Sequence, residues 1–177
     1  MLAEIATLYD EQPAKKESLL QQARLVTTDA ETRKRIDDDL KRIALLDKPL
    51  DLQFISVAGN PVDVKQYRGK VVFVVFFAQW SVPSLKALEG VQAAVKHVPQ
   101  TAAIGISLDP EPEKLAAFAK TRALDWPLAC DGKVWNSPLA RTFGINSLPT
   151  VWLVDSSGTL KRLNIRHDWE EAARQAR

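Results

Sequence analysis

The feature that most constrains the fold of this chain is an unbroken run of β-branched and aromatic residues, Val71–Phe77. Such side chains favour strands, and a strand without alternating polar residues is typical of one that is covered on both faces. The run is far too short to cross a bilayer, which takes about 20 apolar residues. We therefore predict a central strand of a sheet that is buried between other elements.

The segments around this strand alternate between helical and strand periodicity. A short strand over residues 52–55 and a turn over 58–61 precede it. The pattern after it predicts a helix over 81–96, a strand over 103–108, a helix over 111–122, a short helix over 138–143, a hairpin of strands 151–154 and 159–163, and a last helix capped by Asp168 with Glu171. This order implies an α/β fold in which helices flank a mixed sheet.

The first 48 residues have helical periodicity throughout. Apolar stripes are formed by Leu2, Ile5, Ala6 and Tyr9, by Leu19, Leu20 and Ala23 after Pro13, and by Ile36, Leu40 and Ile43 after a Thr28–Glu31 capping box. Short helices cannot bury such stripes alone, so we expect them to pack on each other or on the domain that follows. Because a residue before proline avoids the helical region, Lys48–Pro49 ends the segment. We predict an N-terminal helical segment over 1–48 and an α/β domain over 50–177.

Charge and composition narrow the classes of partner. The formal net charge is only +2 and no stripe of Lys and Arg alternates with aromatic residues, so we expect no nucleic-acid partner. The basic runs Lys15–Lys16, Arg33–Arg35 and Lys41–Arg42 alternate with acidic residues 37–39, and we interpret them as the solvated face of a helix. Residues 1–4 lack a basic and an apolar leader region. We therefore expect no signal peptide here, and membrane association only through a segment outside this sequence.

Cysteine and histidine are too scarce for a multi-ligand metal site. Cys130 is the only cysteine, which excludes an intramolecular disulfide, and His97 and His167 lie far apart in the sequence. We expect no metal, no cofactor and surface positions for both histidines. For Cys130, packing as a small apolar side chain is the simpler expectation, and a thiol that pairs with another protein is the alternative.

The stretch Gly69–Ser84 resembles the TlpA-like (redoxin) family of thioredoxin-like proteins. In that family an aromatic strand ending in Ala-x-Trp runs into Cys-x-Pro-Cys at a helix N-terminus. Three further pieces match in the same order: Gly105–Asp109 resembles the second core strand, Ser147–Thr150 the cis-proline loop, and Val151–Gly158 the hairpin after it. The resemblance covers about residues 50–165. It implies a thioredoxin-like fold with an N-terminal helical appendage, and a thiol–disulfide oxidoreductase ancestry.

The two redox cysteines of that family correspond to Ser81 and Ser84 in this sequence. In the family, the helix N-terminus stabilises a thiolate that attacks a substrate disulfide, and the second cysteine resolves the mixed disulfide. A hydroxyl has no accessible anion near neutral pH and forms no disulfide. Ser81 and Ser84 therefore occupy the catalytic positions of the family but cannot carry out its reaction. We predict that the chain as written is redox-inactive.

Two explanations of these serines stay open. Cysteines replaced by serine on purpose would produce the same sequence, and the protein would then be an active thiol–disulfide oxidoreductase. Other positions also depart from the family pattern, however: Phe77 where Trp is usual, Gln79 where Thr is usual, and Ala87–Glu89 in place of Glu-x-Pro. Removing sulfur gives no reason to change these, so we favour a naturally redox-silent member. The question of whether the chain is an enzyme depends on this choice.

The resemblance also implies a binding groove for a protein or peptide. We expect a cis peptide bond at Pro149 and an extended partner segment beside it. The expected contact residues are Trp80, Val82, Pro83, Leu148 and Pro149. Trp80 would lie half-exposed at the groove, the alternative being a core tryptophan. By resemblance alone, the protein would work in an exported, periplasmic compartment.

Other residues receive simpler interpretations. We expect Trp135 and Trp152 to pack in the core or the hairpin, and Asp109 to cap a helix rather than to act as an acid or base. A third hypothesis for the function makes the N-terminal helices a docking module, with the thioredoxin-like domain as their scaffold.

Overall fold

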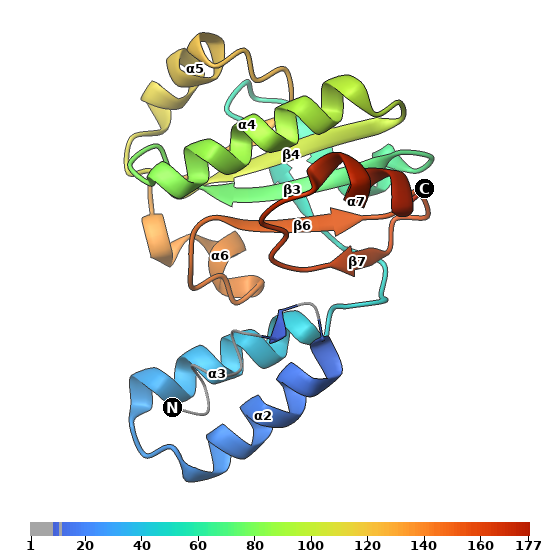
Figure 1. Cartoon of the computed structure of the whole chain (residues 1–177). Coiled ribbons are helices and arrows are strands. Elements are labelled where there is room, and N and C mark those ends of the chain that lie inside the picture. Colours follow the sequence, from blue (N-terminus) through green and yellow to red (C-terminus); the bar gives the residue numbers. More distant parts are fainter. Residues whose placement is uncertain (1–8, 11) are drawn as a thin grey trace.

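A five-stranded mixed sheet lies at the centre of the computed structural model, which describes residues 9–10 and 12–177 (Figure 1). Its strand order is β5-β4-β3-β6-β7. The strands are β3 (Val71–Phe77), β4 (Thr101–Ser107), β5 (Leu128–Ala129), β6 (Thr150–Val154) and β7 (Leu160–Arg162). β3 pairs in parallel with β4 and antiparallel with β6, and β6 forms the predicted hairpin with β7. The α/β, thioredoxin-like architecture predicted from the sequence is confirmed.

The central strand separates two hydrophobic cores. All residues of β3 are buried, as predicted. Because successive side chains point to opposite faces, Phe73 and Phe77 belong to one core and Phe76 to the other. Trp152 of β6 is fully buried in the second core, where its ring lies edge-on to those of Phe76 and Phe143, with centroids 5.2 and 5.4 Å apart. The expected core position of Trp152 is thus confirmed.

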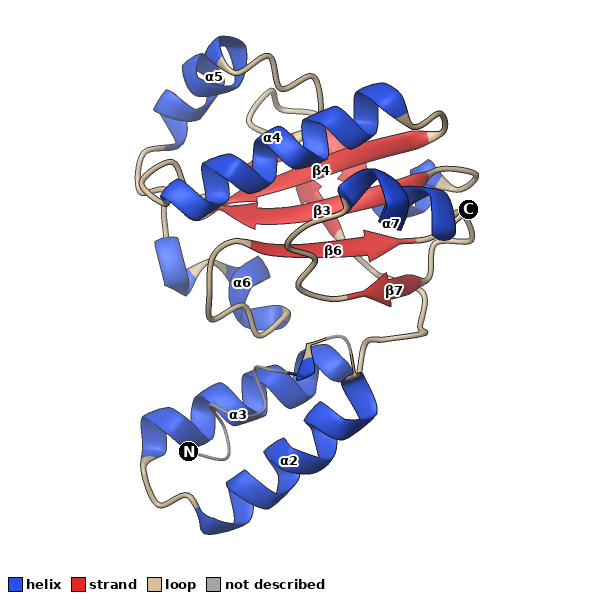
Figure 2. Cartoon of the chain, viewed as in Figure 1, coloured by secondary structure: helices blue, strands red, loops and turns tan. Residues whose placement is uncertain are grey.

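Helices cover both faces of the sheet (Figure 2). One core is closed by α4 (Val82–His97), α5 (Pro112–Thr121) and α7 (Trp169–Gln175). The other is closed by the two-stranded sheet of β1 (Gln53–Ile55) and β2 (Pro61–Asp63), by η2 (Val64–Tyr67), and by α6 (Pro138–Thr142), which follows η3 (Val134–Asn136). Each helix and strand predicted over residues 50–177 is present, with ends shifted by a residue or two.

The predicted cap of the last helix is wrong. Asp168 precedes α7 in a left-handed conformation, with φ 54°, and makes no side-chain bond to the helix. Its carboxylate is instead 2.6 Å from Nδ1 of the exposed His167. N-cap residues normally have extended backbone dihedrals, and the left-handed backbone of Asp168 prevents that geometry.

The N-terminal helices form an antiparallel hairpin of α2 (Pro13–Val26) and α3 (Ala30–Ile43). Leu20, Ala23 and Ile36 make its small core, in agreement with two of the predicted stripes. The predicted Thr28–Glu31 capping box is wrong: Asp29 caps α3 and accepts from the backbone N–H of Thr32 at 2.7 Å. Hydrogen bonding to the side chain and then to the backbone of Thr32 lowers the pKa of Asp29. The stripe formed by Leu2, Ile5 and Ala6 lies outside the described residues.

The segment after the hairpin joins the outer edge of β7. The backbone N–H of Asp47 donates to the carbonyl of Leu160 at 2.9 Å, and the N–H of Leu160 donates to Lys48 at the same distance. The N–H of Leu50 donates to Gly158 at 3.0 Å. The connection is therefore an added stretch of the sheet edge, and it holds the helical hairpin beside the domain (Figure 1).

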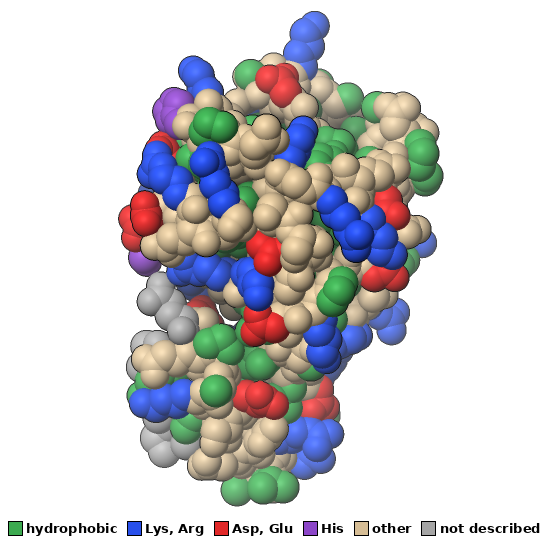
Figure 3. Space-filling model, turned by 90° about the vertical axis from the view of Figure 1, so that its right-hand side faces the viewer, with side chains coloured by type: hydrophobic (Ala, Val, Ile, Leu, Met, Phe, Trp, Pro, Cys, Tyr) green, Lys and Arg blue, Asp and Glu red, His purple; other side chains and the backbone are tan. Residues whose placement is uncertain are grey.

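The charged residues of the hairpin are not all solvated. Lys16 and Arg42 are 6 % and 4 % exposed, so the prediction that the three basic runs lie on the solvated face of a helix is wrong for these two residues. They lie between the hairpin and the domain, where aspartates pair with them. Elsewhere, Lys and Arg side chains spread among acidic ones over the face shown in Figure 3. Within the described residues, no helix is both long enough and apolar enough to cross a membrane.

Candidate functional site

Ser81 starts the helix that follows the central strand. Its backbone is extended, and its Oγ accepts from the N–H of Ser84 at 3.4 Å, so Ser81 is the N-cap of α4. Pro83 lies in the first turn, where its missing N–H is no loss. The local sequence thus builds a regular helix N-terminus at the carboxyl end of β3.

Apolar side chains flank this N-terminus on the surface. Trp80 is 57 % exposed and Val82 63 % exposed, although both are large apolar residues. Trp80 is therefore a surface residue rather than a core tryptophan. The two residues flank Ser81 in the sequence, and Ser81 is itself buried.

The strand register brings the proline loop to the same end of the sheet. The peptide bond between Leu148 and Pro149 is cis. Thr150 at the start of β6 is paired with Phe76 of β3, so Pro149 lies level with the end of β3, where the segment of Ser81 begins. Leu148 packs against the second core and is partly buried. All the residues predicted for the site therefore belong to two adjacent segments at one end of the sheet.

Asp109 ties a third segment to this end. It is 4 % exposed, and its two carboxylate oxygens accept from the backbone N–H of Gln79 at 3.0 and 3.1 Å. The Ser107 hydroxyl also donates to it, at 2.6 Å. The prediction of a helix cap is wrong, because α5 has Glu111 at its N-cap position. Asp109 instead holds the segment before Trp80. The position of this carboxylate directly after a buried strand is the sequence feature that could have indicated its role at this end of the sheet.

Residues 46–163 match the AhpC/TSA family. The chain belongs to this family. The thiol-disulfide oxidoreductase ResA of Bacillus thuringiensis subsp. konkukian is 28% identical over 105 residues, 58% of this chain and 59% of ResA. The chain thus matches about three-fifths of the length of such curated relatives.

Solved structures share the fold of this AhpC/TSA chain. A thiol:disulfide interchange protein from Chlorobium tepidum superposes with a TM-score of 0.61 at 21% identity, over 71% of this chain and 92% of that one. A secreted thiol-disulfide isomerase from Corynebacterium glutamicum superposes with a TM-score of 0.61 at 17% identity, over 73% and 82%. The resemblance to thioredoxin-like proteins drawn from the sequence is confirmed.

Ser84 is the anomaly in this AhpC/TSA site. Its side chain is fully buried, and among the described residues its Oγ has no hydrogen-bond partner. Leaving a hydroxyl unpaired in a core costs about 1–3 kcal/mol, whereas a thiol behaves as a small apolar side chain that needs no partner. The surroundings of Ser84 suit a sulfur or a methyl group better than a hydroxyl.

Replacing either serine by alanine should therefore have opposite effects. Ser84→Ala should leave the free energy of unfolding unchanged or raise it by up to about 1 kcal/mol, because an unpaired buried hydroxyl is removed. Ser81→Ala should lower it by about 1 kcal/mol through loss of the N-cap. Urea unfolding followed by circular dichroism measures both. An equal loss of stability in the two variants would contradict the assignment of Ser84 as unpaired.

Cys130 also lies at this end of the sheet, after β5. It is partly buried, packs against the first core, and its Sγ donates to the backbone carbonyl of Asp109 at 3.3 Å. This agrees with a packed side chain, although the burial is incomplete. Trp135, by contrast, is 42 % exposed in η3, so the prediction that it packs in the core or the hairpin is wrong.

The histidines and the acidic residues form no metal centre in the described part of the chain. His97 and His167 are exposed, as predicted. His97 lies 3.0 Å from Glu170, and this bond, together with Arg174, lowers the pKa of the Glu170 carboxyl. The pair joins α4 to α7 on the surface, far along α4 from Ser81.

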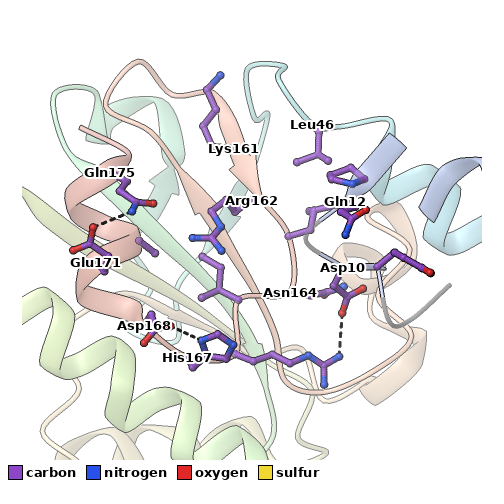
Figure 4. A pocket seen from close by; sticks show the side chains of 16 residues that line it. Asp10, Gln12, Leu46, Lys161, Arg162, Asn164, His167, Asp168, Glu171 and Gln175 are labelled. Atoms are coloured by element: carbon purple, nitrogen blue, oxygen red, sulfur yellow. Dashed lines mark hydrogen bonds and ion pairs between the residues drawn. The ribbon is translucent and has the colours of Figure 1, made fainter. Parts of the chain in front are cut away.

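A separate hollow of about 940 Å³ lies between the helical hairpin, β7 and α7 (Figure 4). Two pairs of its charged side chains bond each other: Arg166 bonds Asp10 at 3.3 Å, and His167 bonds Asp168 at 2.6 Å. Neither Ser81 nor Pro149 lines it. The hollow is therefore distinct from the family's redox position.

Proposed function

We propose that this protein is a redox-silent member of the AhpC/TSA family that binds an extended segment of a partner protein beside Ser81 and Pro149. The observation that carries the proposal is the exposure of Trp80 and Val82, 57 % and 63 %, next to a motif without sulfur. Exposed aromatic and aliphatic side chains beside a strand end suit a partner that adds backbone hydrogen bonds and inserts apolar side chains.

The chemistry of the serines supports binding without turnover. Ser81 Oγ is engaged as the helix cap, and Ser84 Oγ is buried. Neither hydroxyl can form a disulfide, and no acid or base bonds to either one among the described residues. A partner segment would thus be held and released without a covalent step. An exported location is part of the proposal, in line with the secreted isomerase that shares the fold.

The test uses an extended probe peptide that cannot react. Reduced, S-carboxymethylated insulin B chain is titrated into the ¹⁵N-labelled full chain, and amide chemical shifts are followed. Residues 80–84 and 148–151 should shift. Trp80→Ser/Val82→Ser should weaken binding at least about ten-fold, because each buried apolar side chain contributes about 1.5–3 kcal/mol.

The matched control is Leu25→Ser/Val26→Ser. These side chains are 84 % and 72 % exposed at the far end of α2, so the control removes a comparable apolar pair. It should bind the probe as the unaltered chain does. Shifts confined to the helical hairpin, or lost in the control, would support the docking-module hypothesis instead.

A second candidate function, dithiol–disulfide oxidoreduction, is favoured by one observation. The unpaired and fully buried Ser84 Oγ occupies a place that suits sulfur. If the native gene encodes cysteine at positions 81 and 84, the protein is an oxidoreductase and the serines are replacements. Sequencing of the two codons separates the candidates.

A further inference from the structure

A cluster of buried charges lies where the helical hairpin meets the domain. Lys16 Nζ is 2.5 Å from Oδ1 of Asp10 and 3.9 Å from Oδ2 of Asp39, and Asp39 also pairs with the guanidinium of Arg42. The side chains of Lys16 and Arg42 are 8% and 4% exposed. Two cations removed from water need such partners, because an unpaired buried charge is strongly destabilising. Each buried cation of the cluster is therefore paired with an aspartate.

The cluster reaches the loop that leads to the cis proline. The second arm of the Arg42 guanidinium donates to the backbone carbonyl of Gly144, which lies 102 residues away in the sequence. The side-chain amide of Asn146 donates to Asp39 at 3.2 Å and to the carbonyl of Arg35 at 3.4 Å. Gly144 and Asn146 lie four and two residues before Leu148 in the same loop.

The backbones also approach closely at this point. Gly144 has φ +64°, and a Cβ atom there would lie 2.8 Å from the backbone carbonyl oxygen of Asp38. Lys41 adds a bond from its Nζ to the carbonyl of Arg141 at 3.1 Å. The hairpin therefore contacts the end of α6 and the start of the loop mainly through the backbone carbonyls of Arg141 and Gly144. The close approach at Gly144 leaves no room for a side chain at that position.

We infer that the α2–α3 hairpin positions the loop carrying Leu148 and Pro149, with Arg42 as the principal positioning residue. The functional role of this positioning rests on the proposed function, since the loop forms one side of the proposed binding surface. Because Arg42 bonds both its own helix and the loop, the hairpin and the loop move as one unit. Detaching the hairpin then loosens one wall of the surface while the sheet beneath it stays folded.

Hydrogen exchange of the full chain, followed by mass spectrometry, tests the inference without any ligand. In Arg42→Met, peptides covering residues 143–150 should exchange about ten-fold faster, since a hydrogen bond to a charged group is lost. The amide of Ile145, which donates to the carbonyl of Ala140 at 2.8 Å, is a reporter within that segment. Peptides from β3 should keep their rates, and Arg42→Lys should restore part of the protection.

The matched control is Arg24→Met, which breaks the exposed pair of Arg24 with Asp37 in the same hairpin and should leave the loop unchanged. Asn146→Ala is a milder second variant that keeps both buried cations, and it should loosen residues 143–150 in the same direction. Wild-type exchange of this segment in Arg42→Met would overturn the inference, whether or not the hairpin loosens. Equal acceleration in β3 would also overturn it, because the effect would be global.

The outcome is independent of the proposed function. Loop exchange that responds to Arg42→Met, in a protein that shows no shifts with the probe peptide, would leave the positioning role intact and contradict only the binding proposal.

Discussion

The double variant Ser81→Cys/Ser84→Cys is expected to form an intramolecular disulfide and to catalyse the reduction of insulin by dithiothreitol, whereas the unaltered protein should not exceed the uncatalysed rate. The two side chains are three residues apart in the first turn of α4, close enough for Ser81 Oγ to accept from the N–H of Ser84. The helix N-terminus stabilises a thiolate at the first position and lowers its pKa from about 8.5.

The assay needs a background in which only this pair can react. Cys130→Ser is therefore added, and the single variant Ser81→Cys serves as the matched control that cannot close a ring. Oxidation with glutathione disulfide removes two protons and two electrons from the cysteine pair and yields two molecules of glutathione. Alkylation and mass spectrometry count the remaining thiols. Two protected cysteines together with insulin reduction would indicate recent or deliberate loss of sulfur.

The opposite outcome has an equally definite meaning. If no disulfide forms even with excess oxidant, the helix N-terminus has drifted from the geometry that a disulfide requires. The geometry of the helix N-terminus would then support the interpretation that the protein is naturally redox-inactive, as the unusual residues around the motif do.

The variant lacking residues 1–48 is expected to melt on the order of 10 °C below the full chain, because a loss of about 3 kcal/mol lowers the melting temperature by roughly 2–4 °C per kcal/mol in a protein of this size. Two backbone hydrogen bonds to Leu160 disappear with Asp47 and Lys48. Leu45 and Leu46, which pack against the second core, disappear as well. Partial burial of these leucines and the two bonds account for that magnitude.

Differential scanning calorimetry at one protein concentration measures the effect, and Leu25→Ser/Val26→Ser is the control that should melt near the full-length temperature. An unchanged melting temperature in the deletion variant would show that the helices are an independent unit. The docking-module hypothesis would then gain over a structural role.

The sequence alone determined the features that depend on local pattern. The apolar run of β3 predicts burial on both faces because its periodicity leaves no polar face, and the structure agrees. Ser81 and Pro83 predict a helix start because the first-turn N–H groups need a cap and tolerate proline. The serines at positions 81 and 84 likewise exclude a disulfide between these two positions in the chain as written.

Only the tertiary structure decided which charged and polar residues leave the solvent. Arg42 has the pattern of an exposed helical residue, yet it is buried because Asp39 and the carbonyl of Gly144 converge on it. Asp109 has the pattern of a helix cap. Its carboxylate instead accepts from the backbone N–H of Gln79, two residues after the end of the neighbouring strand β3. The cost of burying a charge is offset by partners distant in sequence, and no local periodicity encodes which distant segments will meet.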